Sequence, residues 1–281
     1  MDFFNKFINI DEYKIPKEEE SRIMESLYKI YPTGQDAWGL DLNKANSTLR
    51  YIWPLYKKYF KVRLFGKENI EDTPYIVVSN HSGQIAIDGA LISAAFTIDT
   101  QPPRILRAMV ERFVTKIPFF NTLVSEGGAV LGDRQNCKTL LEKGNSVLVF
   151  PEGVKGIAKN TNNFYQLQNF TRGFFRIAIK TKTPILPVAV VGAEEFYPFV
   201  YHPMKIAKKL GLPALPLTPN LIPLPSPVDI HIGNPIYISD ELDHSTSDSI
   251  IDIEVNKLRL KIDEMLKSGL NNRRDFWANK K

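Results

Sequence analysis

The feature that most constrains the fold is an alternation of short β-rich runs with longer segments of helical spacing, which begins near Lys61. Strands that interleave with helices are typical of α/β proteins with a central sheet. We therefore expect one α/β domain over residues 61–281, with a mostly parallel or mixed central sheet flanked by helices. The runs that predict its strands are 75–79, 105–110, 146–150, 184–191 and 228–232.

Two amphipathic segments precede this alternation. Residues 16–31 and 43–60 carry apolar side chains at helical spacing. We therefore expect residues 1–60 to form an N-terminal helical extension. Pro54 either kinks the second helix or marks its start, because proline lacks a backbone N–H and clashes with the preceding turn.

Two further patterns lie near the C-terminal end. Six prolines stand among leucines between residues 211 and 227. So many prolines forbid a regular helix or central strand, so we expect an extended loop. It either packs over the domain, or dips into lipid or covers an acyl-chain groove. After it, an apolar stripe over residues 251–266 predicts a helix, capped near Ser247 or Asp248.

Charge and cysteine content narrow the possible classes of protein. The chain has 36 Lys and Arg against 31 Asp and Glu, a formal net charge of +5, and its pI is near 9.0. This balance favours anionic partners such as lipid head groups, phosphorylated metabolites or nucleic acid, without choosing among them. Cys137 is the only cysteine, which excludes a disulfide scaffold and is compatible with a reducing compartment.

Hydropathy and histidine spacing bear on location and metal binding. No run of about 18 apolar residues predicts a transmembrane helix. The N-terminus also lacks the apolar run and small-residue cleavage site of a signal peptide. We therefore expect a cytoplasmic protein, either soluble or resting on a membrane. The four histidines are scattered without metal-ligand spacing, so we expect no metal site.

His81 differs from the other histidines in its surroundings. It follows the run 75–79, a Ser82-Gly83 turn comes next, and a helix is expected to begin around Asp88. Open α/β sheets tend to place binding sites at the carboxyl ends of strands. On one continuous helix the two side chains would be about 10 Å apart, so contact requires the loop to fold back. The Asp88 carboxylate would then fix the tautomer of the His81 imidazole, as a carboxylate does for a catalytic histidine base. The alternative is a structural histidine.

Glycine residues and a basic residue also stand at the ends of two other predicted strands. Residues 150–156, Phe-Pro-Glu-Gly-Val-Lys-Gly, follow the strand at 146–150, and within residues 127–134 Arg134 comes just after a further short strand. Arg134 and Lys155 suit an anionic group held by side chains and backbone amides. The alternative is a pair of turns with solvated charges. A phosphate loop of the nucleotide-binding type is excluded, because no glycine–lysine–hydroxyl run follows a strand.

Four blocks of the chain occur in the order and spacing of the four motif blocks of glycerolipid acyltransferases. They are Asn80-His81 with Asp88, residues 128–134, Phe150-Pro151-Glu152-Gly153 and Ile185-Leu186-Pro187-Val188. The chain therefore resembles the lysophospholipid acyltransferase superfamily over residues 60–235, and the resemblance implies that superfamily's α/β fold. His81-Ser82-Gly83 and Arg172-Gly173-Phe174 resemble its monoacylglycerol-acyltransferase-like branch.

The resemblance implies a fatty-acyl transfer in which His81 is the general base. It would take the proton of a lysophospholipid or glycerolipid hydroxyl, with lysophosphatidate favoured, while Asp88 holds the imidazole. The acyl donor would be acyl-CoA or acyl-carrier-protein, and no other cofactor is implied. The alternatives are transfer to monoacylglycerol or another hydroxylated lipid, a thioesterase or lipid hydrolase, and a non-enzymatic lipid-binding protein.

By the same resemblance, the second and third blocks bind the acceptor. Arg134, Glu152 and Gly153 are implied as acceptor-binding residues, and Lys155 is a further candidate. The chain departs from the family's commonest pattern twice: six residues rather than four separate the histidine from the aspartate, and Val-Lys follows Gly153 in place of Thr-Arg. Lysine keeps the charge but loses the bidentate recognition of phosphate that arginine gives.

Membrane contact is expected at two segments. Residues 49–60 and 273–281 combine aromatic and basic side chains, which suits an anionic bilayer surface. The alternatives are a helix packed in the core and a solvated tail. We expect the protein to be peripheral on the membrane. Nucleic-acid binding is not expected, because no basic stripe with regularly spaced aromatic residues occurs.

Overall fold

The computed structural model describes residues 13–82, 87–110, 127–209 and 217–273. Within these ranges seven strands form one sheet in the order β1-β7-β6-β2-β5-β3-β4. β7 pairs antiparallel with β6, whereas the other neighbours pair parallel, so the predicted α/β fold with a mixed central sheet is confirmed. The strands are β1 (Arg63–Phe65), β2 (Ile76–Ser79), β3 (Arg107–Val110), β4 (Val130–Leu131), β5 (Val147–Val149), β6 (Ile185–Val191) and β7 (Asp229–Ile232).

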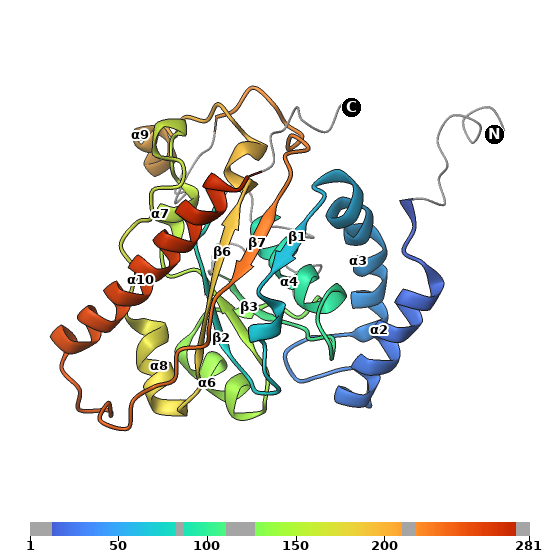
Figure 1. Cartoon of the computed structure of the whole chain (residues 1–281), viewed down its shortest axis with the longest axis horizontal. Helices are drawn as coiled ribbons and strands as arrows, with labels where there is room; N and C mark the ends of the chain where they lie inside the picture. Colours follow the sequence, from blue (N-terminus) through green and yellow to red (C-terminus); the bar gives the residue numbers. More distant parts are fainter. Residues whose placement is uncertain (1–12, 83–86, 111–126, 210–216, 274–281) are drawn as a thin grey trace.

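Helices cover both faces of the sheet (Figure 1). On one side lie α2 (Lys17–Ile30), α3 (Leu42–Pro54) and α4 (Ile87–Ile98), and on the other lie α6 (Arg134–Glu142), α8 (Gly173–Thr181) and α10 (Asp248–Asn271). The shorter elements are a π-helical turn η2 (Leu55–Tyr59), helices α7 (Val154–Ile157) and α9 (Met204–Lys209), and 3-10 turns η3 (Lys67–Asn69), η5 (Thr161–Asn163) and η6 (Ala193–Phe196).

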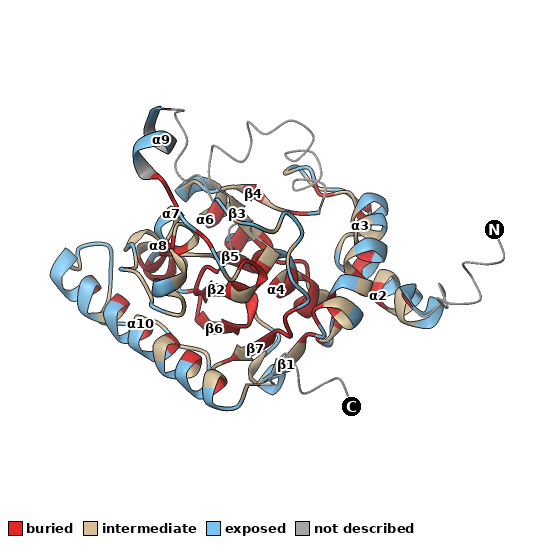
Figure 2. Ribbon diagram, turned by 90° about the horizontal axis from the view of Figure 1, so that it is seen from above, coloured by how far each residue is buried: buried red, intermediate tan, exposed pale blue. Residues whose placement is uncertain are grey.

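The two hydrophobic cores follow from the alternation of side chains along the central strands. In β2, Val77 packs in the core on the side of α2, α3 and α4, whereas Ile76 and Val78 pack in the core with α6, α8 and α10. Successive strand residues face opposite sides of a sheet, so a strand covered on both faces is apolar throughout. Figure 2 shows the buried strands between helices whose outer surfaces are exposed.

One of the two predictions for Pro54 is that a helix begins there, but helix α3 begins earlier, at Leu42. The Asp41 carboxylate accepts hydrogen bonds from the backbone N–H groups of Asn43 and Lys44, which caps the first turn. The α-helix ends at Pro54 and continues as the π-helical turn η2. A helix start at Pro54 is therefore wrong.

Most aromatic residues of segment 49–60 lie in the core. Trp53, Tyr56 and Phe60 are buried in the first core, whereas Tyr51 is exposed. The helix packed in the core is therefore the reading that these contacts support. The tail beyond residue 273 lies outside the described residues. None of the helices in the described ranges is both long and apolar enough to cross a membrane.

The C-terminal predictions agree with the structure where it describes them. Residues 218–227 contain neither helix nor strand, and Leu217 forms an isolated antiparallel bridge with Tyr201. Helix α10 begins at Asp248, and the Ser247 hydroxyl accepts a hydrogen bond from the backbone N–H of Ile250. The predicted cap at Ser247 is confirmed.

Candidate active site

The loop between β2 and α4 folds back so that His81 meets Asp88. Nδ1 of the imidazole lies 2.7 Å from Oδ2 of the carboxylate. The backbone N–H of Ser82 donates to the same oxygen at 2.7 Å, and the N–H of Gly89 donates to Oδ1 at 2.8 Å. Asp88 lies in the first turn of α4, where the helix dipole also favours a negative charge. The contact that the spacing left open is therefore made.

The hydrogen bond to Asp88 determines which ring nitrogen is available for chemistry. An ionised carboxylate can only accept hydrogen bonds, so Nδ1 carries the hydrogen that it donates to Oδ2. Nε2 is then the unprotonated nitrogen of the neutral ring. Asp88 is fully buried, and the side chain of His81 is 11% exposed. This arrangement suits a base that accepts a proton from a bound hydroxyl group.

The residues that follow β5 also contact His81. The His81 backbone N–H donates to Oε1 of Glu152 at 2.8 Å. Its ring stacks on Phe150, with the ring centroids 4.0 Å apart and an angle of 16° between the planes. A Cβ added at Gly156 would lie 2.7 Å from the His81 Cβ, so only glycine allows α7 to approach this closely. These contacts fix the position of the imidazole.

The carboxylate of Glu152 faces protein groups. Its Oε2 accepts a hydrogen bond from the backbone N–H of Gln168 at 2.7 Å and lies 3.4 Å from Nζ of Lys159. With Oε1 bonded to His81, both oxygens are occupied and the side chain is fully buried. These contacts favour a role in supporting His81. The binding of the acceptor by Glu152, which the family resemblance implies, stays a prediction.

Lys159 and Glu194 were not anticipated from the sequence. Nζ of Lys159 lies 3.0 Å from Oε1 of Glu194 and 3.3 Å from the carbonyl oxygen of His81. Both side chains are almost fully buried. Burial raises the pKa of the Glu194 carboxyl, and the charge of Lys159 opposes that shift. A glutamate just after a buried strand could have drawn notice to Glu194, whereas nothing in the local sequence singles out Lys159.

Among the described residues, the other predicted acceptor-binding residues form no hydrogen bond or ion pair with His81. Arg134 is an exposed residue at the start of α6, beyond β4. β4 lies three strands from β2, which corresponds to about 14 Å across the sheet. Lys155 is exposed on α7, directly before Gly156. Gly153 has φ of +57°, a conformation that glycine adopts most readily. Their roles stay predictions.

Among the residues that the structure describes, no group of three or more His, Cys, Asp and Glu side chains is arranged to hold a metal ion. Asp88, Glu152 and Glu194 instead receive hydrogen bonds from backbone N–H groups.

Comparisons with known proteins identify the family of this chain. A family model described as Acyltransferase matches residues 61–191. An uncharacterized protein of Mycobacterium leprae is 33% identical over 254 residues, which cover 86% of this chain and 69% of that protein. The chain belongs to the acyltransferase family. A human protein, "DGAT1/2-independent enzyme synthesizing storage lipids", is 28% identical over 165 residues, which cover 58% of this acyltransferase and 50% of that enzyme.

A solved structure shares the fold of this acyltransferase. The crystal structure of the 1-acyl-sn-glycerophosphate (LPA) acyltransferase PlsC from Thermotoga maritima superposes with a TM-score of 0.54. The aligned region covers 97% of this chain and 90% of that chain, at 18% sequence identity. At this identity the similarity extends to the fold, and it supports the predicted glycerolipid-acyltransferase-like architecture.

Proposed function

We propose that this acyltransferase moves a fatty acyl group from acyl-CoA or acyl-carrier-protein to a hydroxyl group of a glycerolipid. The observation that carries the proposal is the 2.7 Å contact between Nδ1 of His81 and Oδ2 of Asp88 at the buried end of β2. It supplies a base with an orienting carboxylate, and the family supplies the class of reaction.

In the proposed reaction, the hydroxyl proton of the acceptor moves to Nε2 of His81 as the hydroxyl oxygen attacks the thioester carbonyl carbon. Nδ1 keeps its hydrogen, so the imidazolium that forms lies beside the Asp88 carboxylate. When the C–S bond breaks, the imidazolium returns the proton to the thiolate, and the products are an ester and a free thiol. A positioned base of this kind contributes about 10²- to 10⁴-fold in rate.

Lysophosphatidate is the favoured acceptor. Arg134 and Lys155 are exposed, and both follow strands whose carboxyl ends share one edge of the sheet with His81. Two cations at that edge suit a phosphate group. A neutral hydroxylated lipid such as monoacylglycerol is the second candidate, because one relative is named for the synthesis of storage lipids.

The deciding experiment measures thiol release from acyl-CoA with a panel of acceptors. The panel contains lysophosphatidate, other lysophospholipids and monoacylglycerol. We expect release that depends on an acceptor and that falls to about one thousandth or less in His81→Ala. His244→Ala, which changes an exposed histidine, is the matched control and should keep full activity. Thiol release that is equal with and without acceptors would identify a thioesterase, and none with any acceptor would contradict the proposal.

A further inference from the structure

The strongest remaining feature is a set of exposed apolar side chains between β6 and β7. Leu221 is 91% exposed, Ile222 73% and Phe199 69%. We call this set the apolar rim. Its six members are Phe199, Tyr201, Ile206, Leu217, Leu221 and Ile222. Phe199, Tyr201 and Leu217 line one cavity, and apolar side chains gathered on a protein surface mark an interaction site.

The backbone that carries the rim is held in place although the side chains point outward. The Asn220 side-chain amide donates to the carbonyl oxygens of Phe196 and Ile222, at 2.9 and 2.8 Å. The Tyr59 hydroxyl donates to the carbonyl oxygen of Pro223 at 2.6 Å. Leu221 and Ile222 therefore sit on a tethered loop and are presented to the surroundings.

The charge of this region has one sign. Residues 196–228 contain three lysines and neither Asp nor Glu, in a chain with 31 acidic residues. Lys205 and Lys209 are exposed on α9, next to the rim. Apolar side chains bordered by lysines complement a surface that is apolar inside and anionic outside, which is the surface of an anionic bilayer.

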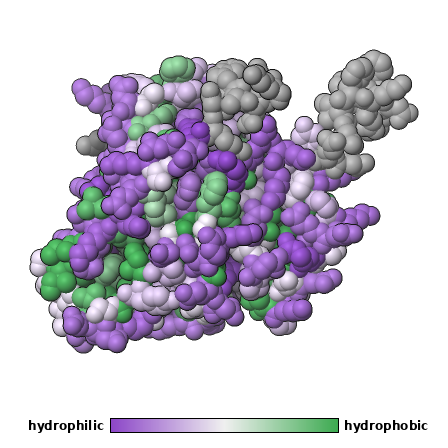
Figure 3. All heavy atoms as spheres, viewed as in Figure 1, coloured by the Kyte–Doolittle hydropathy of each residue, from purple (hydrophilic) through white to green (hydrophobic). Residues whose placement is uncertain are grey.

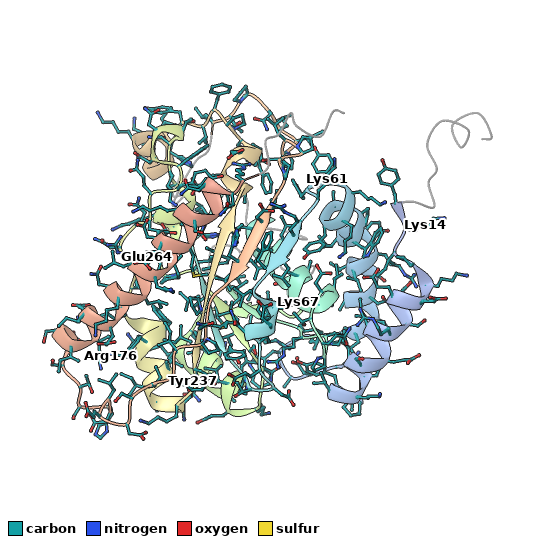
Figure 4. All side chains as sticks on the ribbon, viewed as in Figure 1. Lys14, Lys61, Lys67, Arg176, Tyr237 and Glu264 are labelled. Carbon is teal, nitrogen blue, oxygen red and sulfur yellow. The ribbon has the colours of Figure 1, made fainter. Side chains whose placement is uncertain are left out.

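The rim also lies at the end of the molecule that carries the candidate active site. In Figure 1, α9 and the segment before β7 lie beyond the end of β6. Figure 3 shows small groups of apolar atoms among hydrophilic ones at that end, and a larger apolar area at the lower left. Figure 4 labels Lys61 toward the same end, and Arg176 and Tyr237 toward the opposite end.

A cavity adjoins the rim. It has a volume of about 520 Å³ and is lined by Phe199, Tyr201, Leu217 and Pro219 on the rim side, and by residues 160–162 on the other. Residue 160 follows Lys159, whose Nζ lies 3.3 Å from the His81 carbonyl oxygen. The Asn160 side of the cavity is thus one residue along the chain from Lys159, which contacts the loop that carries His81.

We propose that the apolar rim docks on an anionic lipid bilayer and places the cavity mouth at the membrane surface. This inference rests on the proposed function for the identity of the substrate, but not for the binding itself. A second copy of the chain is a poorer occupant, because a self-complementary interface centred on the rim would bring the lysines of both copies together.

Vesicle flotation without donor or acceptor tests the proposal. We expect the protein to float with phosphatidylglycerol vesicles and to bind phosphatidylcholine vesicles more weakly. Leu221→Ser with Ile222→Ser should weaken binding by about tenfold or more, because two aliphatic side chains no longer enter the bilayer. Lys205→Gln with Lys209→Gln should weaken binding by about fivefold for each lysine at low salt.

Matched controls change exposed side chains of the same residue types elsewhere. Ile253→Ser with Leu260→Ser, on α10, and Lys180→Gln with Lys261→Gln should leave flotation unchanged. If the rim and α10 double variants float equally well, the proposal is overturned. It is also overturned if light scattering finds a dimer that the rim variant alone makes monomeric.

A soluble substrate separates this proposal from the proposed function. The rim variant should turn over a short-chain, monomeric acceptor at the wild-type rate, because its base is untouched. Loss of flotation with this activity retained supports docking by the rim. A different result is possible: the wild type floats, the rim variant does not, and neither protein transfers an acyl group. That result would contradict the proposed function and still support the docking surface.

Discussion

At the scale of single residues, the site depends on the Asp88 carboxylate, both oxygens of which accept hydrogen bonds from protein groups. Asp88 accepts hydrogen bonds from two backbone N–H groups and from the ring of His81. The backbone donors fix the position of the carboxylate, and the carboxylate fixes the tautomer of the ring. Asp88, in the first turn of α4, therefore determines which ring nitrogen of His81 carries the hydrogen.

Asp88→Asn should lower kcat by about a thousandfold while the fold persists. The amide can turn its N–H₂ toward Nδ1, which would leave the hydrogen on Nε2 and remove the basic lone pair. The measurement is kcat over a range of pH, with near-ultraviolet circular dichroism to check the fold. Asp252→Asn, which changes an exposed aspartate on α10, serves as the control. Wild-type turnover in Asp88→Asn would refute the orienting role.

His231 should make the protein less stable at acidic pH. Burial lowers the pKa of His231, and Nε2 is buried without a hydrogen-bond partner among the described residues. As the pH falls, the unfolded chain takes up this proton before the folded protein does, so the free energy of unfolding decreases. Urea unfolding at pH 7 and pH 5 should show a smaller decrease for His231→Asn than for the wild type. An equal decrease would show that other groups control the effect.

At the scale of elements, a buried ion cluster joins the ends of three strands. Lys159, after α7, contacts Glu152 at the end of β5 and Glu194 beyond β6, and it reaches the carbonyl oxygen of His81 after β2. Two buried carboxylates share one buried ammonium group. The cluster holds the three strand ends together around His81. Because the ammonium group contacts both carboxylates, removing one charge affects the others.

Lys159→Met should destabilise the protein by about 3–5 kcal/mol, because it leaves two buried carboxylates without a counter-charge. Adding Glu194→Gln should recover part of that loss, since the amide removes one of the stranded charges. The free energy of unfolding in urea measures both effects. Lys155→Met, an exposed neighbour on α7, should change stability by less than about 0.5 kcal/mol. Additive losses in the double variant would contradict the coupling.

At the scale of the whole molecule, the N-terminal helices and the sheet share one core. Ile23, Leu42 and Tyr56 are fully buried in the same cluster as Val77 and Leu186. The family model begins at residue 61. The residues before and after this boundary nevertheless pack in the same core. The helical extension is part of the folded unit.

A chain that starts at residue 61 should therefore fail to fold. Each buried aliphatic or aromatic side chain that is removed costs about 1.5–3 kcal/mol. Several of them exceed the 5–15 kcal/mol that typically stabilises a domain. The full chain should unfold in one transition detected equally by near- and far-ultraviolet circular dichroism. A truncated protein with native near-ultraviolet signal would contradict this prediction.

Local patterns predicted the elements better than their relations. The alternation along the chain predicted most strands, and Ser247 predicted the start of α10, because both signals are local. The short strand β1 and the antiparallel pairing of β7 with β6 were not predicted, since strand order depends on packing across the whole sheet. The pair Lys159 and Glu194 escaped notice because only tertiary contacts bring these residues together.

His81 and Asp88 both come from one continuous stretch, residues 76–98, which includes β2 and α4. The walls of the cavity come from residues 160–162 and 199–201, Leu217 and Pro219, far along the chain. Under the proposed function, the catalytic pair and the lipid entrance are encoded in separate parts of the gene. Mutation or recombination in the later loops would then change which lipid enters without altering the His81–Asp88 pair.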